Sequence, residues 1–140
     1  MPYSMNWYIP DEILYIHYSG VTTIEEMRES LLEMKRLMDS SPRNLIHAIS
    51  DVGDITQSVP LKDSIKIVRE VGQHARAGWT IVIREKSIII KMQSALATSI
   101  FKLRYRTFDT MDQALAHLKV SDAELNWDKA DPSVVELVKF

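Results

Sequence analysis

Short β-like runs alternate with helix-like runs four times along this chain of 140 residues. The β-like runs, which are rich in β-branched and aromatic residues, are Leu14–Tyr18, Leu45–Val52, Trp79–Arg84 and Tyr105–Phe108. Helical periodicity follows them from near Ile24, Val59, Ile88 and Met111. This alternation predicts an α/β domain whose sheet is largely parallel and whose functional groups lie at strand ends.

One more β-like run precedes the others. Met5–Ile9 and Glu12–Tyr18 are separated by Pro10-Asp11, and proline followed by aspartate favours a tight turn. We therefore predict a hairpin and, in all, a single domain with a mixed sheet of about five strands and Met5–Ile9 at an edge. Because crossovers between parallel strands are right-handed, we expect the four main helices to lie largely on one face.

Three sites have the residue types that begin helices. Thr22-x-x-Glu25 and Thr110-x-x-Gln113 have the form of capping boxes. Ser58 followed by Pro60 is a further predicted helix start. Behind the first box, Met27, Met34 and Met38 recur on one helical stripe, which we interpret as core packing.

The end of the chain departs from this regular pattern. We assign residues 1–120 to the α/β domain and residues 121–140 to a C-terminal extension. Trp127 and the apolar run Val134–Val138 are too hydrophobic for a solvated tail. The extension is therefore expected to pack on the domain or to be partly ordered.

Composition excludes several classes of protein. The chain has no cysteine, so it has no disulfide framework, thiol nucleophile or cysteine-bound metal. The first six residues lack the pattern of a signal peptide. The longest apolar stretch, Ser87–Phe101, contains Lys91 and Gln93 and is too short to span a bilayer. We expect a cytoplasmic protein with no membrane span and no nucleic-acid partner.

The motifs of the common enzyme classes are missing. There is no Gly-x-Ser-x-Gly elbow, and the four glycines form no phosphate-binding loop. The four histidines show no metal-ligand spacing; they are His17, His47, His74 and His117. We therefore expect no enzymatic activity, no cofactor and no metal.

The candidate site lies after the second run of the alternation. Asp51 and Asp54 follow a strand that we expect to be central, and Thr56 and Ser58 add hydroxyls before a helix start. The end of a parallel strand is where open α/β sheets bind ligands and partners. The same residue types are those that a connecting turn needs, so the pattern is equally compatible with a plain loop.

The third predicted helix is apolar around much of its circumference. Ile89, Leu96 and Ile100 line a second stripe beside the main one. Such a helix is either buried within one chain or offers a surface to a partner. We predict a homodimer patch on this stripe.

Three segments together resemble a known superfamily. They are Tyr18–Met27, Leu45–Val52, and Gly78–Val82 followed later by Arg106–Leu115. Over residues 3–118 their order and character are similar to the STAS superfamily, and within it to the SpoIIAA-like (STAS/SEC14-like) proteins. The resemblance implies a SpoIIAA-like fold.

What the resemblance implies for function depends on one loop. Bacterial anti-sigma-factor antagonists of the superfamily carry Asp-Ser-Ser/Thr-Gly in the loop after the central strand, and a partner kinase phosphorylates the hydroxyl. The nearest stretch here is Ile55–Pro60, which keeps Thr56 and Ser58 as hydroxyls but lacks the aspartate and glycine. The implied function is a non-catalytic regulatory module that binds an unidentified protein partner without a phosphorylation switch. The alternative, from the SEC14 side, is a carrier of a small apolar molecule or lipid.

Overall fold

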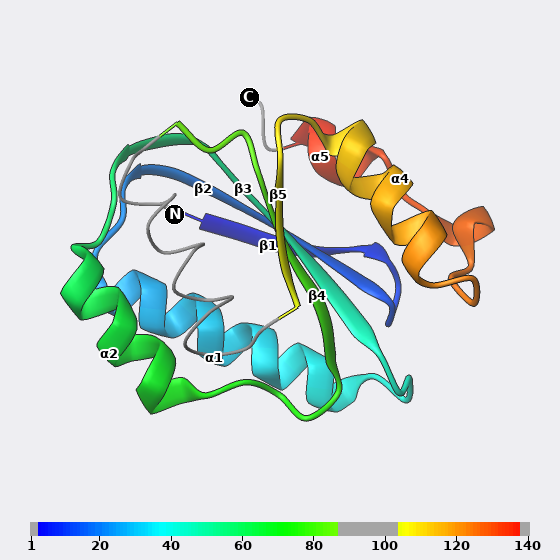
Figure 1. Ribbon diagram of the computed structural model, residues 1–140, viewed down its shortest axis with the longest axis horizontal. Helices are drawn as coiled ribbons and strands as arrows, with labels where there is room; N and C mark the ends of the chain where they lie inside the picture. Colours follow the sequence, from blue (N-terminus) through cyan, green and yellow to red (C-terminus); the bar gives the residue numbers. More distant parts are fainter. Residues whose placement is uncertain (1–2, 87–103, 138–140) are drawn as a thin grey trace.

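The computed structural model describes residues 3–86 and 104–137 (Figure 1). Five strands form one sheet in the order β1-β2-β3-β4-β5, and β1 pairs antiparallel with β2 while the other pairs are parallel. The strands are β1 Tyr3–Ile9, β2 Ile13–Val21, β3 Ile46–Gln57, β4 Ala77–Ile83 and β5 Tyr105–Phe108. The predicted hairpin, mixed sheet and edge position of the first strand are confirmed.

The helices of the described ranges follow the predicted order. They are α1 Ile24–Ser40, α2 Leu61–Val71, α4 Met111–Ser121 and α5 Ser133–Leu137, with a 3-10 turn η1 at Trp127–Lys129. The helix predicted from near Ile88, with its proposed dimer residues Ile89, Leu96 and Ile100, lies outside the described residues. The homodimer therefore stays a prediction.

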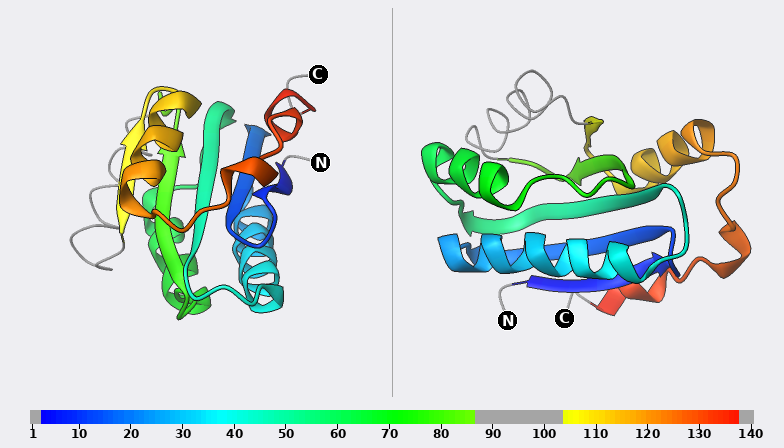
Figure 2. Two further views of the ribbon diagram at one scale, coloured as in Figure 1. Left: turned by 90° about the vertical axis from the view of Figure 1, so that its right-hand side faces the viewer. Right: turned by 90° about the horizontal axis from the view of Figure 1, so that it is seen from below.

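Helices cover both faces of the sheet, which corrects the expectation of one face. In the left view of Figure 2, α4 and α5 lie in front of the strands, and α1 and α2 lie behind them. Ile13 and Tyr15 pack with α4 and α5, whereas Leu14 and Ile16 pack with α1. Right-handed crossovers between parallel strands place α1 and α2 on the same face. Helix α4 follows the last strand, β5, so it does not connect two strands and the rule does not apply to it. It is therefore free to cover the opposite face.

The two central strands are longer than predicted. β3 continues to Gln57, paired with β2 through Ser19–Asp54, Gly20–Ile55 and Val21–Gln57. The connection expected after this strand, which holds Asp54 and Thr56, is thus mostly strand. The register of this pairing shifts twice, which is how a sheet accommodates residues of low strand propensity such as glycine and aspartate.

The helix starts agree with the sequence only in part. Thr110 and Gln113 form the predicted capping box of α4. The box of α1 lies one residue later than predicted, between Thr23 and Glu26. Helix α2 has Pro60 at its N-cap and no side-chain cap, so Ser58 does not begin it as expected.

The segment after α4 packs across the sheet. Leu125 and Val134 are buried in the same cluster as Ile13 and Tyr15. The backbone N–H of Asp131 donates to the carbonyl of Tyr8 at 2.8 Å, so this segment also contacts the edge strand.

Candidate functional site

The two predicted carboxylates do come together at the carboxyl ends of the parallel strands. Asp51 Oδ1 accepts a hydrogen bond from Arg84 Nε at 2.8 Å, and Asp54 Oδ2 accepts one from Arg84 Nη2 at 3.0 Å. His17 Nε2 lies 2.7 Å from Asp54 Oδ2. The Tyr15 hydroxyl donates to Asp51 Oδ2 at 2.9 Å. We call these five side chains the carboxyl-edge cluster.

The two carboxylates differ in how far they are buried. The side chain of Asp51 is 4% exposed and that of Asp54 is 46% exposed. The hydrogen bond from His17, together with that from Arg84, lowers the pKa of Asp54. Burial and the Asp51 carboxylate raise the pKa of the Tyr15 hydroxyl, which therefore stays protonated as a donor. The cluster consists of groups that satisfy one another.

The backbone of Arg84 has an unusual conformation. Its φ is 59°, in the left-handed region that residues other than glycine rarely adopt. The guanidinium then lies over Gly53, where an added Cβ would come within 2.6 Å of the Arg84 Cζ. Gly53 is thus required by the close approach of Arg84, and the cluster holds the residue that follows β4 against the middle of β3.

The other two predicted residues lie elsewhere. Thr56 is exposed near the end of β3, and Ser58 is half-buried in the short connection to α2. Ser58 lines a cavity on the face of the sheet that α1 and α2 cover, whereas Thr56 does not. The structure therefore does not gather Asp51, Asp54, Thr56 and Ser58 into one site.

The cavity lies between α1, α2 and the sheet, and we call it the α1–α2 cavity. Its volume is about 250 Å³. Its apolar lining comes chiefly from facing sides of the two helices, namely Met27, Leu31, Met34, Met38, Leu61, Ile65, Val68 and Val71. Val52, Val82 and Tyr105 contribute from the strands. The α1 residues include the methionines that the sequence assigned to the core.

The ionisable groups at the cavity wall are already bound. Lys35 Nζ donates to the carbonyl oxygen of Val71 at 2.7 Å. His74 Nε2 lies 2.6 Å from Asp39 Oδ1. Among the described lining residues these are the two that could carry positive charge, and both have protein partners. The space between the helices is thus mainly apolar.

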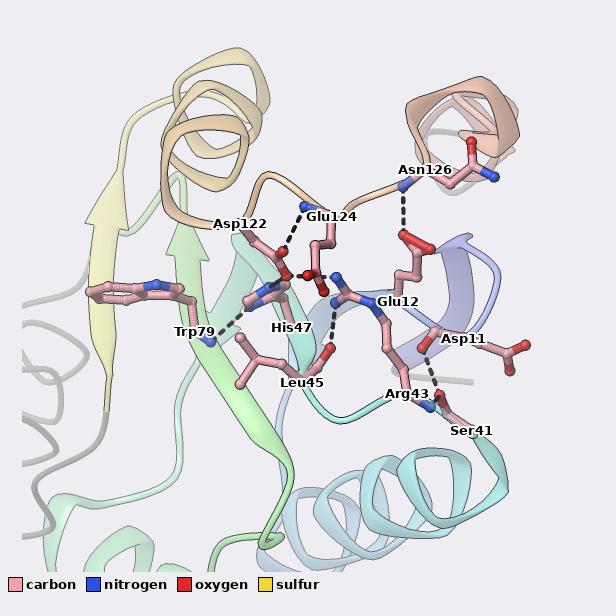
Figure 3. Close-up of polar contacts among 10 residues, drawn as sticks. All are labelled: Asp11, Glu12, Ser41, Arg43, Leu45, His47, Trp79, Asp122, Glu124 and Asn126. Atoms are coloured by element: carbon pink, nitrogen blue, oxygen red, sulfur yellow. Dashed lines mark hydrogen bonds and ion pairs between the residues drawn. The ribbon is translucent and has the colours of Figure 1, made fainter.

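A second polar network lies at the opposite end of the sheet (Figure 3). His47 is fully buried, and its Nδ1 accepts a hydrogen bond from the Trp79 N–H at 2.9 Å. The other ring nitrogen, Nε2, therefore carries the proton and donates to Asp122 Oδ2 at 2.9 Å. Arg43 Nη2 donates to the same oxygen at 2.8 Å. The Glu124 N–H donates to Asp122 Oδ1 at 3.1 Å.

This network is structural in character. Burial lowers the pKa of His47, so the imidazole is neutral in the folded chain. Burial alone would raise the pKa of Asp122, but the hydrogen bonds from His47 and Arg43 outweigh it and lower that pKa. Each of these groups has its partners within the chain. The sequence missed this network because its members come from segments far apart.

Two further features concern the described residues alone. No group of three or more histidine, aspartate or glutamate side chains in residues 3–86 and 104–137 is placed to hold a metal ion. Within the same ranges, no helix has both the length and the apolar character needed to cross a membrane.

The architecture defines the class of domain. A five-stranded mixed sheet with an N-terminal hairpin and helical crossovers is an α/β fold. No family model matches the sequence, and no curated protein matches it. The structure is similar to that of an uncharacterised protein of the DUF3478 family with a SpoIIAA-like fold, from Shewanella loihica PV-4. The TM-score is 0.60 at 14% identity, over 83% of this chain and 93% of that one.

This likeness establishes the fold. The chain has a SpoIIAA-like fold, which confirms the resemblance seen in the sequence. At 14% identity the likeness is one of fold alone.

Proposed function

We propose that the protein is a non-catalytic binding module of the STAS type whose α1–α2 cavity receives a small apolar molecule. The observation that carries this proposal is the cavity itself, with a volume of about 250 Å³ and mainly apolar walls. Ligand sites are usually concave and largely apolar, with a few polar groups that orient the ligand. An engineered apolar cavity of about 150 Å³ binds benzene. The α1–α2 cavity therefore has room for a bicyclic ring or a short alkyl chain.

The side chains of the cavity suit a ligand of variable shape. Three methionines of α1, at positions 27, 34 and 38, line it. Methionine is unbranched and polarizable, so it adapts to an irregular apolar surface better than leucine or valine does. The sheet beneath supplies a rigid floor, because β3 is paired on both sides.

Lack of enzymatic activity is part of the same proposal. The side chains at the carboxyl edge that could act as acid or base are engaged with one another. Asp51 accepts hydrogen bonds from Tyr15, Arg84 and the Gly53 N–H and is almost fully buried. A general base must be within hydrogen-bond reach of the proton that it removes. This arrangement supports a role for the carboxyl-edge cluster in fixing strand ends.

Naphthalene is a suitable probe for the cavity. A ligand that binds only the folded chain raises the melting temperature in a concentration-dependent way. We expect that effect with the full chain, and we expect Ile65→Trp to abolish it, because Ile65 lines the cavity and the larger ring fills the space. Leu32→Trp is the matched control, since Leu32 is 51% exposed on α1 and does not line the cavity.

Two results would contradict the proposal. One is an unchanged melting temperature of the wild-type chain at saturating naphthalene. The other is equal stabilisation of Ile65→Trp and Leu32→Trp. Mass spectrometry of the protein isolated from its native cell would then identify any natural ligand.

A second candidate function is the regulatory one, a contact with a protein partner at the carboxyl edge. Val21 is 52% exposed and Ile24 is 38% exposed. Val21 pairs with Gln57 across β2 and β3, so these apolar side chains lie near the exposed Thr56. Exposed apolar residues rimmed by polar ones are typical of protein contact sites.

The test of this second function is the double variant Val21→Ser/Ile24→Ser. We expect it to fold normally and to lose any partner that the wild-type chain captures in its native cell. Leu32→Ser removes a similarly exposed side chain from another part of α1 and should keep the partner. Capture that is the same for both variants would reject this surface. Stoichiometric phosphate on Thr56 or Ser58 would restore the phosphorylation switch that the proposal leaves out.

A further inference from the structure

One serine and one threonine of the strands line the floor of the α1–α2 cavity. Ser50 on β3 and Thr80 on β4 both line it. Ser50 pairs with Val82 and Thr80 pairs with Ala48, so Ser50 and Thr80 are diagonal neighbours on one face of the sheet. The floor of the cavity therefore carries a small polar spot at the junction of β3 and β4.

The hydroxyl of Ser50 is the more informative of the two. The residue is only 9% exposed, yet in the described part of the chain its side chain forms no hydrogen bond. The Ser50 oxygen is not fully enclosed, because it borders the α1–α2 cavity, so it pairs with whatever fills that space. Without a ligand that partner is water, and a ligand that displaces the water must supply a hydrogen-bonding group of its own or lose this pairing.

The charges around the cavity limit the chemistry of that partner. Lys35 is bound to the carbonyl of Val71, and His74 lies against Asp39. Neither is placed among the described residues as a free cation for an acidic ligand. Burying a carboxylate beside Ser50 without a counter-charge is costly, whereas an uncharged hydroxyl or carbonyl needs only a hydrogen bond.

We propose that Ser50, with Thr80 beside it, binds the single uncharged hydrogen-bonding group of an otherwise apolar ligand. This inference rests on the proposed function, because it requires the α1–α2 cavity to be a ligand site. It adds the chemical class: an apolar alcohol or ketone rather than a hydrocarbon or a carboxylic acid. Ser50 and Thr80 are specificity-determining residues, since a site built to pair a polar group discriminates against analogues that lack it.

Three probes that share one ring system test this class. They are naphthalene, 2-naphthol and 2-naphthoate, each titrated into the full chain by calorimetry. We expect 2-naphthol to bind about fivefold more tightly than naphthalene, the effect of one net hydrogen bond. The 2-naphthoate anion should bind most weakly.

Variants then assign the preference to residues. Ser50→Ala should bind naphthalene within about twofold of wild type but lose most of the preference for 2-naphthol, and Thr80→Val should reduce that preference. Unchanged naphthalene binding shows that a variant is folded. Thr107→Val, which removes an exposed hydroxyl from β5 outside the cavity, should keep the full preference.

The outcomes separate the two proposals. If none of the three probes binds, the cavity function fails and this inference fails with it. If naphthalene and 2-naphthol bind equally, if Ser50→Ala keeps the preference, or if 2-naphthoate binds most tightly, the inference is overturned while the cavity function stands.

Discussion

The imidazole of His47 donates a hydrogen bond to the carboxylate of Asp122 at 2.9 Å, although the two residues lie 75 positions apart. The first is on β3 and the second is at the end of α4. Arg43 contacts the same carboxylate, so one side chain from late in the chain balances the charge of Arg43 and orients the neutral ring of His47. This contact joins α4 to the amino end of the sheet.

Removing the carboxylate of Asp122 should destabilise the fold strongly. Asp122→Ala leaves Arg43 and His47 without their acceptor in a mostly buried site. Breaking a buried pair in this way costs about 3 kcal/mol of unfolding free energy. The control is Asp128→Ala, an exposed aspartate in η1, for which we expect less than about 0.5 kcal/mol. Urea denaturation measures both, and equal effects would show that the network contributes little.

Stability should fall as the pH is lowered below about 6.5, the ordinary pKa of histidine. Burial lowers the pKa of His47, so the unfolded chain binds a proton more readily than the folded one does. Stability is thus complete above the unfolded pKa and is lost as the pH falls toward the lower folded pKa, by at most about 1.4 kcal/mol per pH unit. Burial also lowers the pKa of His117, which contributes in the same direction.

Denaturation at several pH values checks this behaviour. His47→Gln and His117→Gln, made separately, should each flatten the slope between about pH 5 and 6.5. A slope unchanged in both variants would assign the acid sensitivity to other groups.

The two aspartates of the carboxyl-edge cluster should differ in their effect on stability. Asp51 is buried with three donors, so Asp51→Asn should cost about 2 kcal/mol of unfolding free energy. Asp54 is 46% exposed, and its ion pairs are screened by solvent, so Asp54→Asn should cost less than about 1 kcal/mol. Chemical denaturation gives the order. The reverse order would mean that exposure does not control these pairs.

Neighbouring threonines before α1 should respond in opposite ways. Thr23→Ala removes the N-cap hydroxyl and should cost about 1 kcal/mol. The hydroxyl of Thr22 is buried with no hydrogen-bond partner among the described residues, so Thr22→Val should be neutral or stabilising. Thermal unfolding distinguishes the two. An equal loss of unfolding free energy for Thr22→Val and Thr23→Ala would instead support Thr22 as the N-cap, as the sequence predicted.

The order of elements could be predicted because it depends on local patterns. The alternation of apolar runs predicted the strands, and the turn residues Pro10-Asp11 predicted the hairpin. The length of β3 could not be predicted, since Gly53 and Asp54 have low strand propensity and are held there by pairing with β2. Tertiary pairing outweighed local preference at this point.

The candidate site was predictable only where it follows from strand order. Asp51 and Asp54 were expected after the end of a strand and do lie close together, but within the longer β3. Their partner Arg84 directly follows β4 and has a left-handed backbone that no pattern signals. The α1–α2 cavity depends on the spacing between two helices above the sheet. Helical periodicity shows which side of each helix is apolar, but not whether the two apolar sides pack together or leave a cavity between them.

The contact between His47 and Asp122 also bears on when the protein can fold during its synthesis. Ile13, Tyr15 and Ile49 are covered by α4 and the segment after it, which leave the ribosome after all five strands. Until then one face of the sheet has no helix of the described chain to pack against. Long-range contacts of this kind make folding slow, and exposed apolar faces in incomplete chains favour aggregation. This face of the sheet therefore gains its cover only after all five strands have been synthesised, and nascent chains that end before Asp122 leave it exposed.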